Sequence, residues 1–362
     1  MDKADAKALV TLLGIELPVI QAPMAGATTP AMVAAVSNAG GLGSLPSGLY
    51  SPDQFAAAIE QVRAATCRPI AVNLLCHRAS PDDPVRQQAW RQRLAAYYVE
   101  AGLDPAMPVP SGGRAPFDEA LCEVVEHYRP EVASFHFGLP DPALLERVRR
   151  VGAKLISSAT TVAEARWLEA RGVDAVIAMG AEAGGHRGNF LSDDMNMQLG
   201  TFALVPQIVD AVSVPVIAAG GISDQRGVRA AFALGASAVQ VGTAYLFTPE
   251  AGIAPVYRQA LTEGKGTALT NVFTGRPARG IVNRLMSELG LMSDLAPPYP
   301  TAASLVGPLR AAAEAAGRGD YSPLWAGQAF PLAKPMPAAA LTRWLAAAIA
   351  EEGGEDAADR AS

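Results

Sequence analysis

The middle of the chain alternates short apolar runs with longer stretches in which apolar residues recur at helical spacing. Each short run ends at a glycine or a polar break, and the stretch after it is rich in alanine. This pattern predicts buried parallel strands that are covered by helices. The predicted strands span residues 18–24, 41–46, 69–75, 132–138, 154–160, 175–180, 215–222 and 238–246. The predicted helices span residues 30–39, 52–65, 141–151, 161–171, 200–212 and 224–235.

Eight strand–helix repeats predict a closed (β/α)8 barrel, the TIM-barrel fold of the α/β class. The rival architecture is an open, doubly wound sheet, which normally has a G-x-G-x-x-G turn after its first strand. The segment "APMAGATTP" lacks this turn, and the glycines of "GGLGSLPSG" fit neither that motif nor a P-loop. We therefore assign residues 1–248 to the barrel, with residues 76–117 as an insertion between the third and fourth strands.

The chain after the eighth strand no longer follows the repeat. Residues 249–321 contain Gly, Pro and several short helical patterns, which predicts a small second domain over the barrel mouth. Residues 322–350 are expected to return to the barrel and to end in a helix. Residues 351–362 are acidic and small, and we expect a flexible tail there.

Composition narrows the class of protein. The chain has 362 residues, 50% of them hydrophobic, which is ample for a large buried core. Its net charge is −6 and its Lys and Arg residues are not clustered, so no nucleic-acid surface is predicted. No apolar run predicts a membrane span, and the N-terminus lacks a signal-peptide cleavage pattern. Cys67, Cys76 and Cys122 form no paired pattern, which is typical of reduced thiols in a cytoplasmic protein.

The ends of the predicted strands are the place to look for chemistry, because barrel active sites are built there. Glycines follow the seventh strand in "AAGGIS" and the eighth in "QVGTAYL", where barrels often bind a phosphate group. Because no dinucleotide motif is present, FMN is the cofactor that best fits this position. The segment "QAPM" would then run along the flavin ring. Asn73 would either hydrogen-bond the polar edge of the ring or serve as a buried amide that pairs with backbone groups.

The chain has four histidines, and His186 is the strongest catalytic candidate. It lies in "AMGAEAGGHRGNF", a glycine-rich loop after the sixth strand whose backbone can come close to a ligand. The alternation along "SFHFG" turns His136 either into the barrel or toward the cofactor, and both remain open. His77 is a candidate for the barrel mouth, and His127 is interpreted as a solvated residue at a helix end. No histidine or cysteine pattern typical of a metal site occurs, so no metal is predicted.

Several short motifs together carry a family resemblance that no single motif would carry. In chain order they are "PVIQAPMAG", "NAGGLGSL", "VNLLCHR", "ASFHFG", "EAGGHRG", "AAGGISD", "QVGTAYL" and "YSPLWAGQAF". From about Leu13 to about Phe330 the chain resembles the class I nitronate monooxygenases, formerly called 2-nitropropane dioxygenases. The combination of "EAGGHRG" with "SFHFG" is the most specific part of this resemblance.

The resemblance implies a TIM barrel with a smaller domain over non-covalently bound FMN. It also implies oxidation of alkyl nitronates, with nitroalkanes as further substrates, by O2 to a carbonyl product and nitrite. His186 would be the catalytic histidine, and His136 and Tyr299 are expected near the substrate. Together with the strand-end argument, the expected FMN-binding residues are Pro23, Met24, Asn73, Met179, Gly184, Gly185, Gly220, Gly221, Gln240, Val241, Gly242 and Thr243.

One position departs from the family pattern. Met179 stands where family members often have glutamine, so a hydrogen bond to the polar edge of the flavin is expected to be lost. The segment "LAPPYPTAASLVGPL" is rich in Ala and Pro, and Tyr299 is its only polar aromatic residue.

The sequence leaves three functions open. The first is nitronate oxidation, in which His186 acts as a base on a neutral nitroalkane, or is protonated and holds an anionic nitronate. The main alternative is an FMN-dependent NAD(P)H reductase of a quinone or an enoyl thioester. A third alternative, from another class, is a barrel without catalytic activity that binds phosphorylated metabolites. A monomer and a homodimer are both compatible with the sequence.

Overall fold

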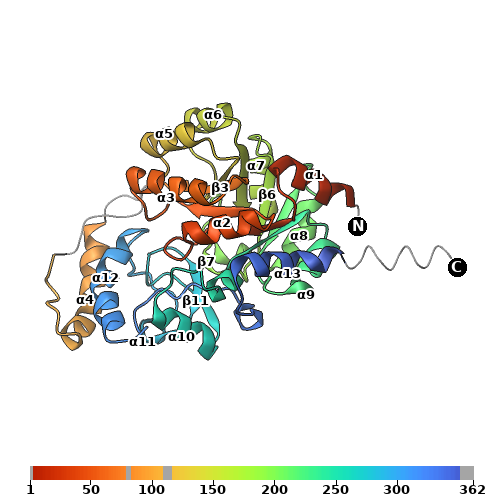
Figure 1. Cartoon of the computed structure of the whole chain (residues 1–362). Helices are drawn as coiled ribbons and strands as arrows, with labels where there is room; N and C mark the ends of the chain where they lie inside the picture. Colours follow the sequence, from red (N-terminus) through yellow and green to blue (C-terminus); the bar gives the residue numbers. More distant parts are fainter. Residues whose placement is uncertain (1–2, 79–82, 109–115, 351–362) are drawn as a thin grey trace.

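The computed structural model describes residues 3–78, 83–108 and 116–350. It shows a barrel of parallel strands beside a smaller unit, the lid, which is formed mainly by residues 84–100 and 255–315 and is joined by residues 185–186 (Figure 1). The barrel strands are hydrogen-bonded in the order β1-β9-β8-β6-β5-β4-β3-β2, and a parallel bridge between Ile20 and Leu42 closes the sheet. The predicted (β/α)8 barrel is therefore confirmed. Its strands are β1 (Val19–Gln21), β2 (Gly43–Pro46), β3 (Ile70–Leu75), β4 (Val132–His136), β5 (Lys154–Ala159), β6 (Ala175–Met179), β8 (Val216–Ala219) and β9 (Ala238–Val241).

The eighth predicted strand is the one that differs most from the structure. Residues 238–246 were expected to be extended, but β9 ends at Val241 and the 3-10 helix η2 (Thr243–Phe247) follows. The backbone leaves the extended region at Gly242, whose φ and ψ are −108° and −78°, and a helical turn with buried side chains follows. The helical turn places the hydroxyl oxygen of Tyr245 2.8 Å from that of Thr342, on the helix that returns to the barrel wall.

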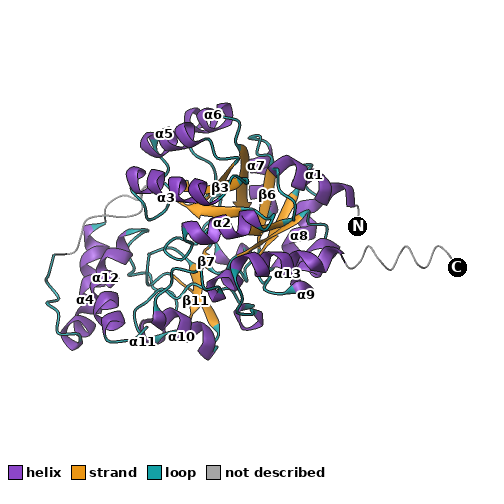
Figure 2. Ribbon diagram, in the orientation of Figure 1, coloured by secondary structure: helices purple, strands orange, loops and turns teal. Residues whose placement is uncertain are grey.

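Helices surround the barrel strands on the outside (Figure 2). The covering helices are α2 (Pro30–Asn38), α3 (Pro52–Ala65), α5 (Glu119–Tyr128), α6 (Pro142–Arg150), α7 (Val162–Glu169), α8 (Thr201–Val209) and α9 (Gln225–Ala233). The helix α13 (Ala338–Ala350) packs against α2 and α9. The helix α1 (Lys3–Leu13) closes the amino-terminal end of the barrel, where Leu9 and Leu13 pack beneath the strands. None of the helices in the described ranges has the length and apolar character that a membrane crossing needs.

The inward-facing side chains of the barrel change from apolar to polar toward the carboxyl ends of the strands. On β3, Ala71 belongs to the lower core, and Asn73, two residues later, lines a cavity above it. On β4 the same face has Val132 in the core, followed by Ser134 and His136 at the cavity. The polar ends of the strands therefore form the floor of a site, while the apolar ends stabilise the barrel.

The lid contains a small antiparallel sheet that the sequence analysis did not predict. Its strands are β10 (Thr267–Thr270), β11 (Ala278–Ile281) and β7 (Gly185–His186), in the order β10-β11-β7. Only short helical patterns were expected in this region, and that expectation was incomplete. The four-residue strands carry no regular apolar alternation, because they are stabilised by pairing between distant segments and not by one buried face.

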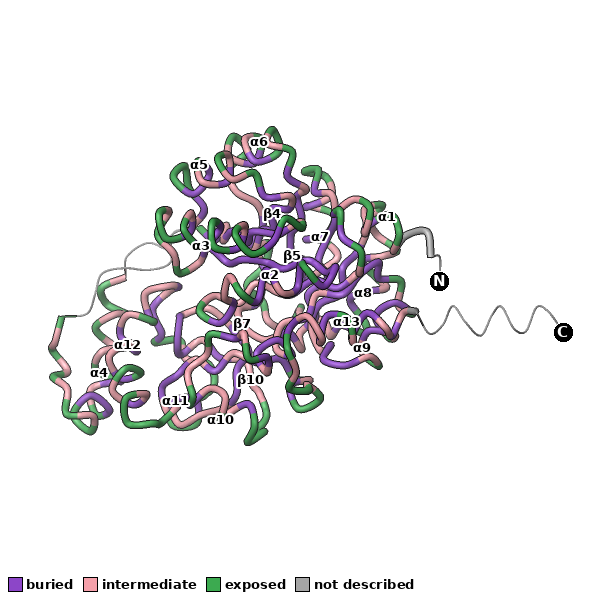
Figure 3. The backbone as a smooth tube through the Cα atoms, viewed as in Figure 1, coloured by how far each residue is buried: buried purple, intermediate pink, exposed green. Residues whose placement is uncertain are grey.

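The lid helices are α10 (Pro255–Glu263), α11 (Arg284–Leu289) and α12 (Thr301–Ala315). The helix α4 (Pro84–Glu100), in the insertion between β3 and β4, lies beside α12 and not against the barrel wall (Figure 1). Trp90 and Leu94 of α4 share a buried apolar cluster with Leu305 and Leu309 of α12. Figure 3 shows buried stretches of backbone in both the barrel and the lid.

Candidate active site

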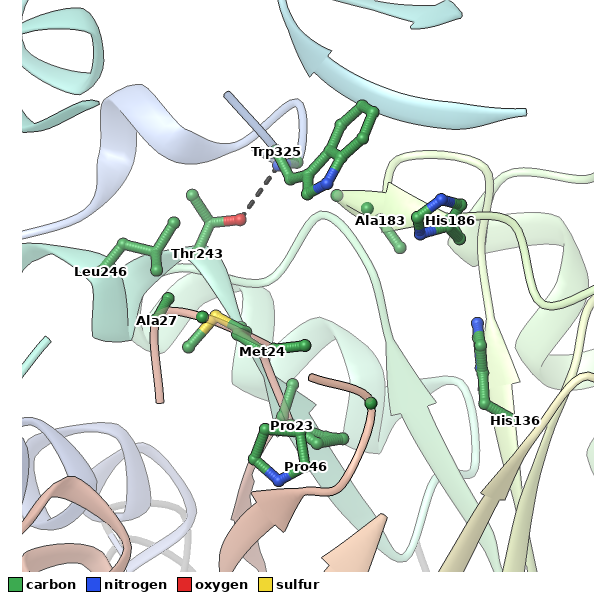
Figure 4. A pocket seen from close by; sticks show the side chains of 18 of the residues that line it. Pro23, Met24, Ala27, Pro46, His136, Ala183, His186, Thr243, Leu246 and Trp325 are labelled. Carbon is green, nitrogen blue, oxygen red and sulfur yellow. Dashed lines mark hydrogen bonds between the residues drawn. The ribbon is translucent and has the colours of Figure 1, made fainter. Parts of the chain in front are cut away.

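A cavity of about 430 Å³ lies between the carboxyl ends of the barrel strands and the lid. In Figure 4, His186 and Trp325 lie on one side of this cavity, and Pro23 and Met24 lie on the other. The cavity lining includes almost every site residue predicted from the sequence. These are Pro23, Met24, Asn73, His136, Met179, Gly184, Gly185, His186, Gly220, Gly221, Gln240, Gly242, Thr243 and Tyr299.

Val241 is the one predicted residue that does not line the cavity. Its side chain is 1% exposed and packs in the apolar cluster between the barrel and its outer helices. This follows from strand alternation, because Gln240 and Gly242 on either side of it face the cavity.

His186 is held in a strand of the lid sheet and not in a free loop. The strand β7 pairs with β11 so that His186 stands opposite Ala278, and the backbone N–H of Arg187 donates to the carbonyl oxygen of Pro277 over 2.9 Å. The imidazole Nε2 lies 2.9 Å from the hydroxyl oxygen of Thr274. This ladder fixes the backbone from which the imidazole projects.

Arg187 anchors the glycine-rich loop to the end of β6. Its side chain is fully buried and donates to the carbonyl oxygens of Met179 and Gly180 over 2.8 and 2.6 Å. Its Nε donates to the side-chain oxygen of Gln198 over 2.9 Å. Burial lowers the pKa of Arg187 to about 10, so the guanidinium remains a cation at neutral pH. The sequence analysis gave this arginine no role, because its partners are backbone carbonyls.

His136 faces the cavity, which settles the orientation that the sequence left open. Its Nδ1 lies 2.7 Å from the hydroxyl oxygen of Ser158. Burial, with a smaller contribution from the charge of Arg276, lowers the pKa of His136 to about 3, although a hydrogen bond to the backbone of His186 acts in the opposite direction. The ring is therefore neutral at neutral pH.

The glycines at the ends of β8 and β9 leave the cavity floor without side chains. Gly220 and Gly221 have φ angles of +104° and +71°, which residues with a side chain rarely adopt. Gly242 has a φ of −108°, and an added Cβ would be only 3.4 Å from the Cβ of Ala22, an ordinary contact. Gly242 therefore leaves free space on the cavity side, while the Gly220–Gly221 pair makes a turn that only glycine adopts without strain.

The glycines around His186 have two different causes. An added Cβ on Gly184 would lie 2.6 Å from the backbone of Ala326 and Gly327, so the lid segment that crosses the cavity requires a glycine there. An added Cβ on Gly188 would lie 2.8 Å from both His136 and Ser158. Close packing of protein groups therefore explains Gly184 and Gly188 in this glycine-rich loop.

Asn73 pairs with a backbone group, as one of the two sequence interpretations expects, and its hydrogen bond to a flavin stays a prediction. Its side-chain nitrogen donates to the carbonyl oxygen of Ser134 over 3.1 Å, so part of the amide pairs with the neighbouring strand. It also lines the cavity while being 7% exposed.

Gln21, which the sequence analysis did not single out, holds the segment around Met24. Its amide nitrogen donates to the hydroxyl oxygen of Thr28 over 3.0 Å, and its amide oxygen accepts from the N–H of Ser44.

Aromatic side chains form the lid side of the cavity. The ring of Tyr299 lies 5.2 Å from that of His186 and 4.9 Å from that of His77, and Trp325 lies 5.4 Å from His186. The ring of Phe137 carries the guanidinium of Arg276 over its face at 4.3 Å. The motif "YSPLWAGQAF" indicated that the segment around Trp325 matters, but only the fold brings Trp325 to His186.

The fold and the cavity define the class of the protein: a (β/α)8-barrel enzyme whose site lies under a lid at the carboxyl ends of the strands. The family model described as nitronate monooxygenase matches residues 6–354. The chain belongs to the nitronate monooxygenase family, as its motifs predicted, and is an enzyme related to those that oxidise nitronates.

Named relatives cover almost the full chain. A nitronate monooxygenase from Pseudomonas aeruginosa is 43% identical over 92% of this chain and 96% of its own length. A nitronate monooxygenase from Paraburkholderia phytofirmans is also 43% identical, over 95% of each chain. Among solved structures, a nitroalkane oxidase from Streptomyces ansochromogenes has a TM-score of 0.87 and 40% identity, covering 95% of this chain and 98% of its own. FabK from Thermotoga maritima has a TM-score of 0.73 and 30% identity, covering 96% and 97%.

Proposed function

We propose that the protein oxidises alkyl nitronates with O2, by means of non-covalently bound FMN, to a carbonyl product and nitrite. The observation that carries this proposal is that the glycine turns after β8 and β9 and the imidazole of His186 line one cavity. Membership of the nitronate monooxygenase family supports the reaction. Neutral nitroalkanes are proposed as further substrates.

The cavity residues fit FMN in their chemistry. Gly220, Gly221 and Gly242 offer backbone without side chains to a phosphate group, and η2 begins without a side-chain cap on its first N–H groups. The Thr243 hydroxyl accepts from the N–H of Gly327 over 2.9 Å and keeps its own proton for a phosphate oxygen. Asn73 would hydrogen-bond the flavin ring. When bound, FMN supplies the acceptor for the electrons of the substrate.

The chain's own residues bind the substrate, orient it and move its proton. His186 accepts the α-proton of a neutral nitroalkane at an imidazole nitrogen, or in its protonated form holds the negative nitro group of a nitronate. His136 is neutral and keeps the backbone of His186 in place. Tyr299 and Trp325 exclude water above His186, which strengthens its interaction with an anion.

Met179 is proposed to line the flavin without a hydrogen bond to it. Its side chain is 9% exposed at the cavity, and its thioether offers only a weak acceptor. Introducing a glutamine there would add a donor near the proposed flavin ring. We expect Met179→Gln to change the flavin reduction potential while flavin content stays the same.

The cofactor and the reaction are tested together on the purified protein. Heat release followed by mass spectrometry identifies the cofactor, and we expect FMN; FAD or no flavin would contradict the proposal. Anaerobic mixing with a preformed nitronate should bleach the flavin absorbance, and readmitted O2 should restore it with release of nitrite. Rapid bleaching by NADH or NADPH, with none by nitronate, would instead support the reductase alternative.

A further inference from the structure

The imidazole of His186 contacts Thr274, a residue that is neither in the family motifs nor in the cavity lining. Thr274 lies in the turn between β10 and β11, where it is 6% exposed. Its hydroxyl oxygen is 2.9 Å from Nε2 of His186 and donates its proton to the carbonyl oxygen of Arg276 over 3.3 Å. The hydroxyl therefore lies between the ring and a backbone carbonyl.

The turn that carries Thr274 is fixed on several sides. Gly275 has a φ of +84°, and an added Cβ there would lie 1.9 Å from the carbonyl oxygen of Pro297. Its N–H donates to the carbonyl oxygen of Asn271 over 2.7 Å. The side chain of Asn271 in turn exchanges two hydrogen bonds, of 2.9 and 2.8 Å, with the backbone of Ser293. A turn held in this way keeps the Thr274 hydroxyl at one position relative to β7.

The direction of these hydrogen bonds determines the tautomer of the ring. We assign the single proton of the Thr274 hydroxyl to the carbonyl oxygen of Arg276, because a backbone carbonyl only accepts; a lone pair of the same hydroxyl oxygen then faces Nε2. Nε2 then carries a proton, and Nδ1 is the basic nitrogen of the neutral ring. In the protonated ring, Nε2 keeps the same partner.

We propose that Thr274 is a positioning residue that fixes the tautomer and the orientation of His186 for the nitronate reaction. The inference rests on the function proposed above, because the orientation of the imidazole affects turnover only if His186 takes part in the reaction. A hydroxyl that passes its proton to a carbonyl orients the ring without adding a negative charge beside an anionic substrate. The Thr274 hydroxyl can therefore orient His186 both as a base and as a cation that holds the anionic substrate.

Other ionisable groups around His186 come from four segments. Tyr299 packs on the ring, His136 on β4 hydrogen-bonds to its backbone, and Arg276 follows the turn that carries Thr274. Arg187 is directed away, to the carbonyl oxygens at the end of β6. The substitution of Thr274 changes none of these side chains, so we attribute a change in the titration of His186 to the loss of the hydroxyl.

The test replaces Thr274 by valine, which has nearly the same shape and no acceptor. Nε2 donates to Thr274 in both forms of the ring, but the hydrogen bond is stronger from the charged ring, so its loss should lower the pKa of His186 by up to about one unit. We expect Thr274→Ser to keep the original pKa. The control Thr267→Val makes the same change on β10, at a hydroxyl that contacts Arg279 and not His186, and should also keep it. The chain has four histidines, so 13C labelling at Cε1 of histidine gives few NMR signals, and His186→Asn assigns the one of interest.

Activity is measured on the same full-length variants. Thr274→Val should lose about tenfold in turnover, with its pH profile displaced to lower pH, and Thr274→Ser should restore both. If Thr274→Val does not fold, Thr274→Ala removes the same acceptor without new atoms. An unchanged titration of His186 in the valine or alanine variant would overturn the positioning role. A displaced titration with unchanged turnover would confirm the hydrogen bond between Thr274 and His186 in the wild type. It would contradict the catalytic role of His186, and with it that part of the proposed function.

Discussion

At the scale of single residues, the structure separates glycines that close protein contacts require from a glycine, Gly242, that the protein around it does not require. Gly184 is required by the backbone of the lid segment, and Gly188 by His136 and Ser158. Gly242 differs, because an added methyl group would meet the protein only at ordinary contact distance. A substitution at Gly242 therefore reports on the ligand and not on the fold.

Gly242→Ala is expected to weaken FMN retention by about tenfold or more, because its methyl group would occupy the space proposed for the phosphate. The free flavin that appears after dialysis, measured by fluorescence, gives the loss. Gly307→Ala, in α12, is the matched control, because its methyl group would meet no atom within 4 Å. Equal flavin content in both variants would place the phosphate elsewhere.

His186→Asn should separate the two roles of the imidazole. If His186 is the base, neutral nitroalkanes should lose about 10² to 10⁴ in turnover, whereas preformed nitronates, which need no deprotonation, should lose much less. FMN content should stay normal. Oxygen consumption with a matched nitroalkane and nitronate at several pH values measures both losses. Equal losses would indicate that the imidazole holds the anion, and no loss for either would leave His186 with a structural role only.

At the scale of elements, the barrel was predictable because its strands are buried and most of them are followed by an amphipathic helix, as in "GLGSLP" and "PVIAAGGI". The lid strands were not predictable, because Gly185–His186 is too short to show a period and "TALT" and "ARGI" show no alternation. Their pairing depends on segments far apart in the chain. The candidate site divides in the same way: the glycine turns follow the strands directly, but Thr274 and Trp325 reach His186 only through the fold.

The loop after β6 depends on Arg187, and Arg187→Met tests this. Methionine fills a similar volume but donates no hydrogen bonds, so the carbonyl groups of Met179 and Gly180 lose their buried partner. We expect a loss of stability of about 2 to 4 kcal/mol and a clear drop in turnover, because β7 shifts with the loop. Urea unfolding and oxygen consumption measure the two effects.

Arg150→Met is the control for this change, because Arg150 on α6 is 68% exposed and forms an exposed i,i+4 ion pair with Glu146. It should alter stability by less than about 0.5 kcal/mol. If Arg187→Met behaves like Arg150→Met, the carbonyl groups of the loop do not need the guanidinium.

At the scale of the whole molecule, the neutral state of His136 should make the protein sensitive to mild acid. The pKa of His136 is about 3 in the folded chain and near 6.5 when unfolded, so the unfolded state binds more protons between these values. The stability contributed by the neutral ring is complete above pH 6.5 and is lost as the pH falls toward 3. Each pH unit within this window removes up to about 1.4 kcal/mol.

Urea unfolding at pH 7 and at pH 5 measures this effect. The wild type should lose more stability between the two pH values than His136→Gln, which has no group that titrates there. His127→Gln is the control, because His127 is exposed at the end of α5 and should leave the wild-type difference unchanged. A difference in His136→Gln as large as in the wild type would mean that His136 titrates normally in the folded protein.

The pairing of β7 with β11 also has a consequence for the order in which the protein is made. His186 leaves the ribosome well before Ala278, its partner in the ladder, and before Thr274. A nascent chain that ends just after β9 contains every strand of the barrel, yet it offers His186 neither a neighbouring strand nor a hydroxyl. All strands of the barrel can therefore be available before the segments that complete the surroundings of His186, and assembly of the active site must wait for the lid.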